Sequence, residues 1–206
     1  MKSYPSIPRS TGTAFSEFNA YVFDKLDGSN LRFEWSKKQK WYKFGTRTRL
    51  FDKSDEVFGE AIPLFQSTMA DKIEKIAVDN RWESVIVFAE FYGAKSFAGL
   101  HEPGDKKFLS VFDVAPYKKG ILGPKEFLDL FCGKVNTATF LGQYHWTRGF
   151  VEKVRMGAIE DITLEGVVGK AGSGHKLQMS KAKTQRWIDM VLAIKSPEEA
   201  KKIIES

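Results

Sequence analysis

The sequence contains one cysteine, three histidines and no long apolar run. A lone cysteine, Cys132, excludes an internal disulfide and favours a reducing compartment, so we expect a cytoplasmic protein. The longest uninterrupted apolar run, "VIVFA" at residues 85–89, is far too short to span a membrane, and no apolar stretch follows the basic start of the chain as a secretion signal would require. The histidines, at 101, 145 and 175, lack the spacing of a zinc site.

The length and composition fit one ordinary globular domain. A chain of 206 residues with 42% hydrophobic residues can bury one sizeable core, and its length leaves little room for two full domains. The net charge of +6 favours a polyanionic partner, but it becomes informative only if the basic residues cluster around a site.

The pattern of apolar residues and turn signals predicts an α+β fold of antiparallel strands with helices outside. We interpret residues 1–206 as a single domain, with C-terminal helices over about 184–206. Pro63 marks either a break or an N-terminal turn in the helical stretch 55–79. The expected strands cover about 20–25, 29–36, 41–48, 84–93, 107–117 and a hairpin over 164–179, and a short helix is expected over 124–131.

One short stretch, "YVFDKLDGSNLR" at residues 21–32, sets a lysine at the end of an apolar strand and then bends sharply. Alone, Lys-x-Asp-Gly is most often a surface turn. The Lys-x-Asp-Gly motif becomes informative because further segments follow it in a fixed order: "GTRTR", "FAEFYG", "SVFDV", "LEGVVGK" and "HKLQMSKAK". Glu90 and Glu165 fall in or beside strands, where a carboxylate needs a partner or a metal. Strands that deliver lysine, arginine and glutamate to one patch indicate a phosphate site with a divalent cation.

This ordered series resembles the motifs of the covalent nucleotidyltransferase superfamily, which contains ATP-dependent DNA and RNA ligases and messenger-RNA capping enzymes. The resemblance implies a nucleotidyltransferase (ATP-grasp-like ligase) domain that uses ATP and Mg²⁺, or Mn²⁺. It identifies Lys25 as the catalytic lysine that takes the nucleotide. Glu90 and Glu165 match the acidic residues for ribose and metal, and Phe112 matches an aromatic that stacks on the purine. The remaining nucleotide-binding matches are Asp24, Asn30, Arg47, Lys170 and Lys176.

The chemistry of this superfamily needs an uncharged lysine amine, because the lysine attacks the α-phosphate of a nucleoside triphosphate. A free lysine has a pKa of about 10.4, so few molecules are nucleophilic at neutral pH. We expect Lys170, Lys176 and Arg47 to lower the pKa of Lys25, together with desolvation. Asp27 would raise that pKa, so a positional role suits it better.

Two of the motifs can each be aligned with this sequence in two ways. "TRTR" allows Arg49 in place of Arg47. The fifth motif is usually Lys-x-Lys, which fits either Lys176 with Gln178 in the second position or a register shifted to Lys181 and Lys183. We prefer Lys176, because we expect it on the strand of a hairpin with Glu165 and Lys170.

The particular residues of these motifs favour one subgroup of the superfamily. "FAEFYG…FDV" and "DGSN" resemble the double-strand RNA-repair ligases called RNA ligase 2, and nothing after residue 183 resembles the OB domain of DNA ligases and capping enzymes. The resemblance therefore implies a minimal, monomeric ATP-dependent RNA ligase acting on nicked duplex or broken RNA, with DNA as a second possibility. A DNA-ligase-like adenylyltransferase, a guanylyltransferase and a degenerate RNA-binding module are the alternatives.

Overall fold

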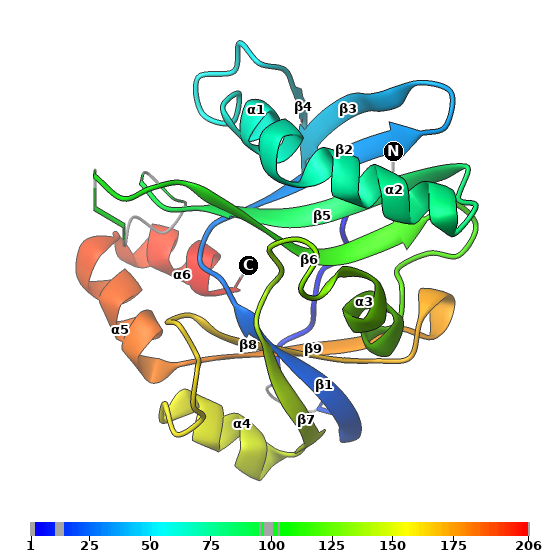
Figure 1. The fold of residues 1–206 in the computed structure, drawn as a ribbon. Helices are drawn as coiled ribbons and strands as arrows, with labels where there is room; N and C mark the ends of the chain where they lie inside the picture. The colour runs from blue at the N-terminus through cyan, green and yellow to red at the C-terminus, as the bar shows by residue number, and fades with distance from the viewer. Residues whose placement is uncertain (1–2, 11–14, 95, 97–100, 103, 206) are drawn as a thin grey trace.

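Two antiparallel β-sheets with helices packed around them form the computed structural model (Figure 1), which describes residues 3–10, 15–94, 96, 101–102 and 104–205. The strands are β1 (Phe18–Lys25), β2 (Ser29–Ser36), β3 (Lys40–Thr46), β4 (Leu50–Phe51), β5 (Ser84–Tyr92), β6 (Phe108–Pro116), β7 (Phe140–Trp146), β8 (Gly166–Ala171) and β9 (Gln178–Lys183). The helices are α1 (Ala61–Phe65), the π-helical η2 (Gln66–Ala70), α2 (Asp71–Asp79), α3 (Pro124–Phe131), α4 (Arg148–Arg155), the 3₁₀ turn η3 (Gly174–Lys176), α5 (Gln185–Ile194) and α6 (Pro197–Glu205). The α+β prediction is confirmed.

The sharp bend after Lys25 is the place where the chain changes sheets. One sheet has the order β7-β1-β8-β9 and the other β4-β3-β2-β5-β6. Lys25 is the last residue of β1 and pairs with Gly166 of β8, whereas Ser29 opens β2 in the other sheet. Gly28 permits the crossing, because a Cβ there would lie 2.5 Å from the carbonyl oxygen of Phe91. The bend therefore holds Lys25 at the junction of the two sheets.

Each sheet buries one apolar face against its own helices. Leu31, Phe33 and Trp35 alternate along β2 and pack with α1 and α2, where Phe65 stacks on Phe33 with ring centroids 4.0 Å apart. A second core surrounds Trp146 between the four-stranded sheet and α4. Figure 1 shows α1 and α2 over one sheet and α4 beyond the other.

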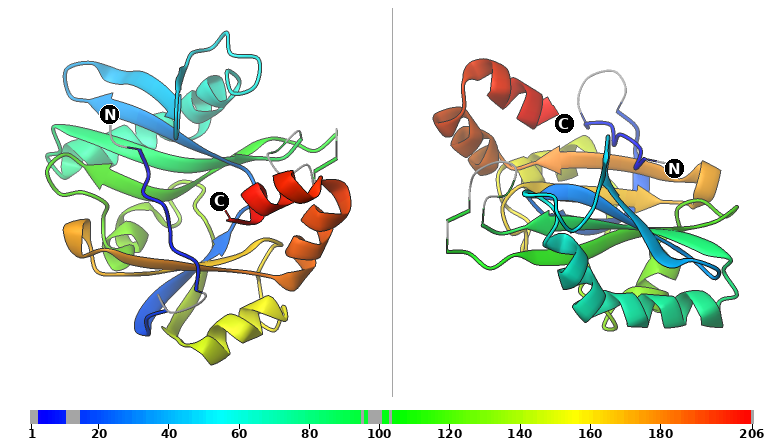
Figure 2. Two further views of the ribbon diagram at one scale, coloured as in Figure 1. Left: turned by 180° about the vertical axis from the view of Figure 1, so that it is seen from behind. Right: turned by 90° about the horizontal axis from the view of Figure 1, so that it is seen from above.

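Two further segments complete the frame. Residues 3–10 cross from one sheet to the other (Figure 2, left): Tyr4 packs on Phe88 of β5, and the Pro8 carbonyl accepts the Lys181 amide N–H of β9 at 3.1 Å. At the other end of the chain, Ser196 and Glu199 form the capping box of α6.

Most of the predicted elements are present, and one is displaced. Pro63 lies in the first turn of α1, where its missing N–H costs no hydrogen bond, so the N-terminal turn is the correct interpretation. The predicted hairpin is wrong in its second strand: the turn extends through η3, and β9 starts only at Gln178. Gly172 and Gly174 have φ of +71° and +57°, a left-handed backbone that lengthens the turn. No described helix combines the length and apolar character that crossing a membrane requires.

Candidate active site

A cleft of about 440 Å³ lies where the two sheets meet, at the C-terminal end of β1. Its wall combines β1 and β2, the turn after β3, β5, β6, β8 and β9 with the N-terminal segment and the C-terminal helices. The structure brings together eight of the nine predicted site residues in this wall: Asp24, Lys25, Asn30, Arg47, Glu90, Phe112, Glu165 and Lys170. The ninth, Lys176, is exposed in η3 and does not line the cleft.

Lys25 is held by a carboxylate and does not extend into bulk solvent. Its Nζ donates to Glu165 Oε2 at 2.7 Å, and 22% of its side chain is exposed. Gly166, which opens β8, pairs with Lys25 on one side and with Lys183 on the other. A Cβ on Gly166 would lie 2.1 Å from the Ala182 carbonyl oxygen, and its φ of +148° suits only glycine. This tight register places Glu165 directly between the two lysines.

Glu165 joins Lys25 to the fifth motif. Its Oε1 lies 3.0 Å from Lys183 Nζ, while its Oε2 accepts from Lys25. Lys181, two residues before Lys183 on β9, lines the same cleft. The expectation that Lys176 stands on a strand beside Glu165 is therefore wrong, and the shifted register with Lys181 and Lys183 is the one that fits the geometry.

The balance of charges on Lys25 differs from the sequence-based expectation. Burial lowers its pKa, but the carboxylates of Glu165, Glu90 and Asp27 outweigh burial and raise the pKa above its ordinary value. The predicted lowering fails because none of the expected cations, Lys170, Lys176 and Arg47, is among the main influences on the pKa of Lys25. Lys170 is paired with another carboxylate, and the cleft does not include Lys176. The chain's own charges therefore favour the ammonium form of Lys25.

The carboxylates of the cleft repel one another. Burial raises the pKa of Glu90 to about 8, with Lys25 opposing the shift and Glu165 and Asp27 adding to it. Burial, with Glu165 next, raises the pKa of Asp27 to about 6. Among the described residues no group of three or more His, Cys, Asp or Glu side chains is arranged to hold a metal by itself. Two hard oxygen ligands, Glu90 and Glu165, nevertheless fit Mg²⁺, which keeps several waters and takes phosphate oxygens as further ligands.

Aromatic side chains form another part of the cleft wall. The Phe112 ring is stacked beside Phe88, with centroids 6.4 Å apart, and Tyr4 meets it edge-on at 5.0 Å. Lys170 is buried behind this wall, where its Nζ donates to the Phe112 carbonyl at 2.7 Å and lies 2.9 Å from Asp113 Oδ2. Lys170 thus supports the strand of Phe112, whereas the sequence predicted it beside Glu90 and Glu165.

Asp24 and Asn30 reach the cleft from β1 and β2. Asp24 is buried, and its carboxylate accepts the Thr163 backbone N–H at 3.0 Å and the Thr163 hydroxyl. Its side chain therefore ties the segment before Glu165 to β1. Asn30 is half-buried opposite Glu90 in the β2–β5 ladder.

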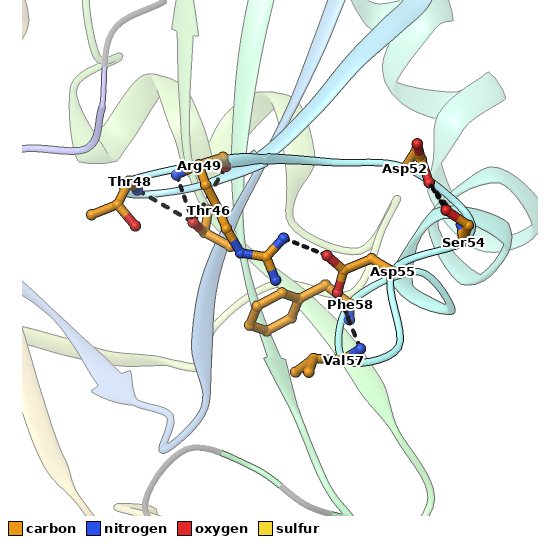
Figure 3. Close-up of polar contacts among 8 residues, drawn as sticks. All are labelled: Thr46, Thr48, Arg49, Asp52, Ser54, Asp55, Val57 and Phe58. Atoms are coloured by element: carbon orange, nitrogen blue, oxygen red, sulfur yellow. Dashed lines mark hydrogen bonds and ion pairs between the residues drawn. The ribbon is translucent and has the colours of Figure 1, made fainter.

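The two arginines of "TRTR" have different environments. The Thr46 hydroxyl accepts the backbone N–H groups of Thr48 and Arg49 and shapes the turn (Figure 3). The Arg49 guanidinium donates to Asp55 and lies over the Phe58 ring. That hydrogen bond is the main reason why the pKa of Asp55 falls to about 2. Arg49 is thus committed to the loop.

Arg47, on the same turn, lines the cleft as an exposed side chain. Burial raises the pKa of Tyr4 and lowers that of Lys181, and the positive charge of Arg47 exerts a small lowering effect on both, which places it on the cleft side of the turn. Of the two arginines, Arg47 is the better placed to meet a ligand.

Sequence reasoning did not place four residues that line or support the cleft. Tyr4, Trp187 and Ile203 line it, and Asp113 supports it by pairing with Tyr4 and Lys170. Asp113 carried a usable signal, because a charged residue inside the apolar stretch "SVFDV" needs a partner. Trp187 carried none, since a tryptophan on a helix is usually core packing.

The chain belongs to the RNA ligase family, whose sequence model matches residues 19–187. No curated protein is a significant match.

Solved structures of ligases share the fold. An archaeal ATP-dependent RNA ligase matches with a TM-score of 0.68 at 16% identity, over 100% of this chain and 56% of that one. A putative ATP-dependent DNA ligase from Aquifex aeolicus matches with a TM-score of 0.63 at 19% identity, over 99% of this chain and 57% of that one. A mutant Naegleria gruberi RNA ligase with ATP and Mn has a TM-score of 0.63 at 16% identity, over 84% and 51%. This chain thus spans about half the length of these proteins.

Proposed function

We propose that the protein is an ATP-dependent polynucleotide ligase, RNA before DNA, that works through a covalent lysyl-AMP on Lys25. The observation that carries this proposal is the position of Lys25 inside the cleft. Its ammonium is hydrogen-bonded to Glu165, which also pairs with Lys183 on the neighbouring strand β9. A lysine on a surface turn would have no such surroundings. Membership of the RNA ligase family favours RNA as the strand that is joined.

The reaction would start with Lys25 as nucleophile. Its deprotonated amine attacks the α-phosphorus of ATP, a P–N bond forms, and the P–O bond to the β-phosphate breaks as pyrophosphate leaves with the electron pair. The AMP then passes to a 5′-phosphate, and a 3′-OH attacks that activated phosphate and releases AMP. Lys181, which lines the cleft, and Lys183, which Glu165 links to Lys25, would offset charge on the α-phosphate, in the role that sequence reasoning gave to Lys176.

The other residues would bind and orient the nucleotide. Phe112 offers an aromatic face for the purine, and Arg47, which lines the same cleft, offers a guanidinium for the phosphates. Glu90 and Glu165 would hold Mg²⁺ or Mn²⁺, whose charge supplies electrostatic stabilisation to the phosphates and offsets the carboxylates that keep Lys25 protonated. Asp24 would act through Thr163 as a support of Glu165.

A direct experiment tests the proposal. The protein is incubated with Mg²⁺ and ATP or GTP labelled at the α-phosphate. One portion is denatured to detect covalent label, and the other is kept native and supplied to nicked duplexes of RNA, DNA and RNA–DNA hybrid. We expect an acid-labile, alkali-stable label on the protein with ATP only, and sealing of the RNA nick. A label from GTP would indicate a guanylyltransferase, and RNA binding without any label would indicate a degenerate binding module.

The two arginines give a matched pair of variants. We expect Arg47→Ala to slow lysine adenylylation roughly tenfold or more, because it removes a charged phosphate ligand from the cleft. Arg49→Ala should have a much smaller effect on that rate, because Arg49 is committed to Asp55 and Phe58. The measurement is the single-turnover rate of adduct formation at several ATP concentrations. Equal losses in the two variants would contradict the assignment of Arg47.

A further inference from the structure

The ammonium group of Lys183 is enclosed by three partners, and two of them come from the C-terminal helices. Its Nζ lies 3.0 Å from Glu165 Oε1, donates to the Ile203 carbonyl of α6 at 3.1 Å, and lies 4.3 Å from the ring centroid of Trp187 on α5. Only 4% of the Lys183 side chain is exposed. A buried ammonium over an indole face is a strong form of cation–π contact.

The start of α5 is fixed so that Trp187 turns back beneath Lys183. Thr184 follows Lys183 directly, and its hydroxyl accepts the Trp187 backbone N–H at 3.2 Å, which caps the helix. The same hydroxyl donates to the Leu164 carbonyl at 2.7 Å, and the Thr184 backbone N–H donates to the Glu165 carbonyl at 2.9 Å. The helix is therefore anchored to the residues that precede β8.

The helices α5 and α6 form a small core of their own around Trp187, Val191, Ala200 and Ile203, separate from the cores under the two sheets. Trp187 and Ile203 also line the cleft. Burial and Glu165 raise the pKa of the Asp27 carboxyl, and the Trp187 side chain opposes that rise. Packing of two helices on each other does not require either of these contacts with the cleft. The pair thus faces both its own core and the charged groups around Lys25.

We infer that the helix pair α5–α6 is a positioning element of the adenylation site, in which Trp187 holds the Lys183 ammonium against the place where the nucleotide phosphates enter. This inference rests on the proposed function. Trp187 acts through Lys183 and is a positioning residue. The Ile203 carbonyl restrains the same ammonium from the second helix, so that its direction is set before ATP binds.

Three variants separate positioning from packing. Trp187→Leu keeps apolar bulk but removes the aromatic face, Trp187→Phe restores an aromatic face, and Val191→Ala weakens the same small core without touching Lys183. The experiment measures the single-turnover rate of lysine adenylylation against ATP concentration, together with the thermal unfolding midpoint of each variant.

We expect Trp187→Leu to lower the rate at saturating ATP about tenfold, with a smaller change in the ATP concentration at half-maximal rate. Trp187→Phe should recover most of the rate. Val191→Ala should lower the unfolding midpoint but keep the rate of the parent protein. A Trp187→Leu variant with the parent rate, or a Val191→Ala variant slowed equally, would overturn the inference.

A second readout does not depend on catalysis. Brief acetylation with an amine-reactive ester, followed by peptide mass spectrometry, reports the accessibility of each lysine. We expect Lys183 to be protected in the parent protein and in Val191→Ala, and to become labelled in Trp187→Leu. Equal labelling of Lys183 in all variants would overturn the inference. If the parent protein forms no nucleotide adduct, the proposed function fails, while this labelling still decides whether Trp187 positions Lys183.

Discussion

Lys25→Ala is expected to abolish the labelled adduct with ATP altogether. The variant lacks the only atom that can form the phosphoramidate in the proposed mechanism, and no neighbouring lysine occupies the same end of β1. Lys183 lies on the far side of Glu165, fully engaged with its partners, and is not positioned to replace it. The measurement is retention of the α-phosphate label after denaturation, followed by mapping of the labelled peptide in the parent protein.

The control for this variant is Lys75→Ala. Lys75 is an exposed lysine on α2 whose partner Asp79 lies four residues further along the same helix, and neither residue lines the cleft. It should form the adduct at the parent rate. Lys25→Arg is a stricter companion, because it keeps the positive charge beside Glu165 while guanidinium stays protonated at any ordinary pH. An adduct in Lys25→Ala, or a labelled peptide that lacks residue 25, would refute the assignment of the nucleophile.

Local signals in the sequence are sufficient to predict most of the frame of the cleft. The apolar run before Lys25 and the glycine after it predict a strand and a sharp bend, and both are present. The strand predicted over 29–36 and the helix predicted over 124–131 match β2 and α3. These predictions depend on neighbours along the chain, and such information is contained in short segments.

The sequence could not predict which side chains pair with one another across strands that lie far apart in the chain. Lys170 has Asp113 as its partner across 57 residues of chain, and nothing in "LEGVVGK" distinguishes that carboxylate from Glu90. The register of the fifth motif depended on the length of a turn, which Gly172 and Gly174 extend through their left-handed backbone. The net effect of three carboxylates on Lys25 could be evaluated only once their positions were known.

Glu165→Gln is expected to cause the largest loss of stability among substitutions in the cleft. Glu165 is 5% exposed and pairs with both Lys25 and Lys183, so its neutral replacement removes the carboxylate that bonds both ammonium groups. Removal of one partner from a buried ion pair costs about 3 to 5 kcal/mol. We expect a loss of that size in the free energy of unfolding at pH 7, measured by denaturant titration. Asp79→Asn, which breaks an exposed helical pair, should leave the unfolding midpoint nearly unchanged.

The pH dependence of this loss has a defined sign. Because Glu165 helps raise the pKa of Lys25 in the folded protein, the pairing contributes stability below the pKa of the unfolded lysine, about 10.4, and the contribution disappears as pH rises through the folded pKa. The difference between the parent protein and Glu165→Gln should therefore be greatest near neutral pH and shrink as the pH is raised past about 10.4. A difference that stays constant as the pH rises well past about 10.4 would mean that Glu165 stabilises the fold through packing and hydrogen bonds, and that its charge is not what holds Lys25 in place.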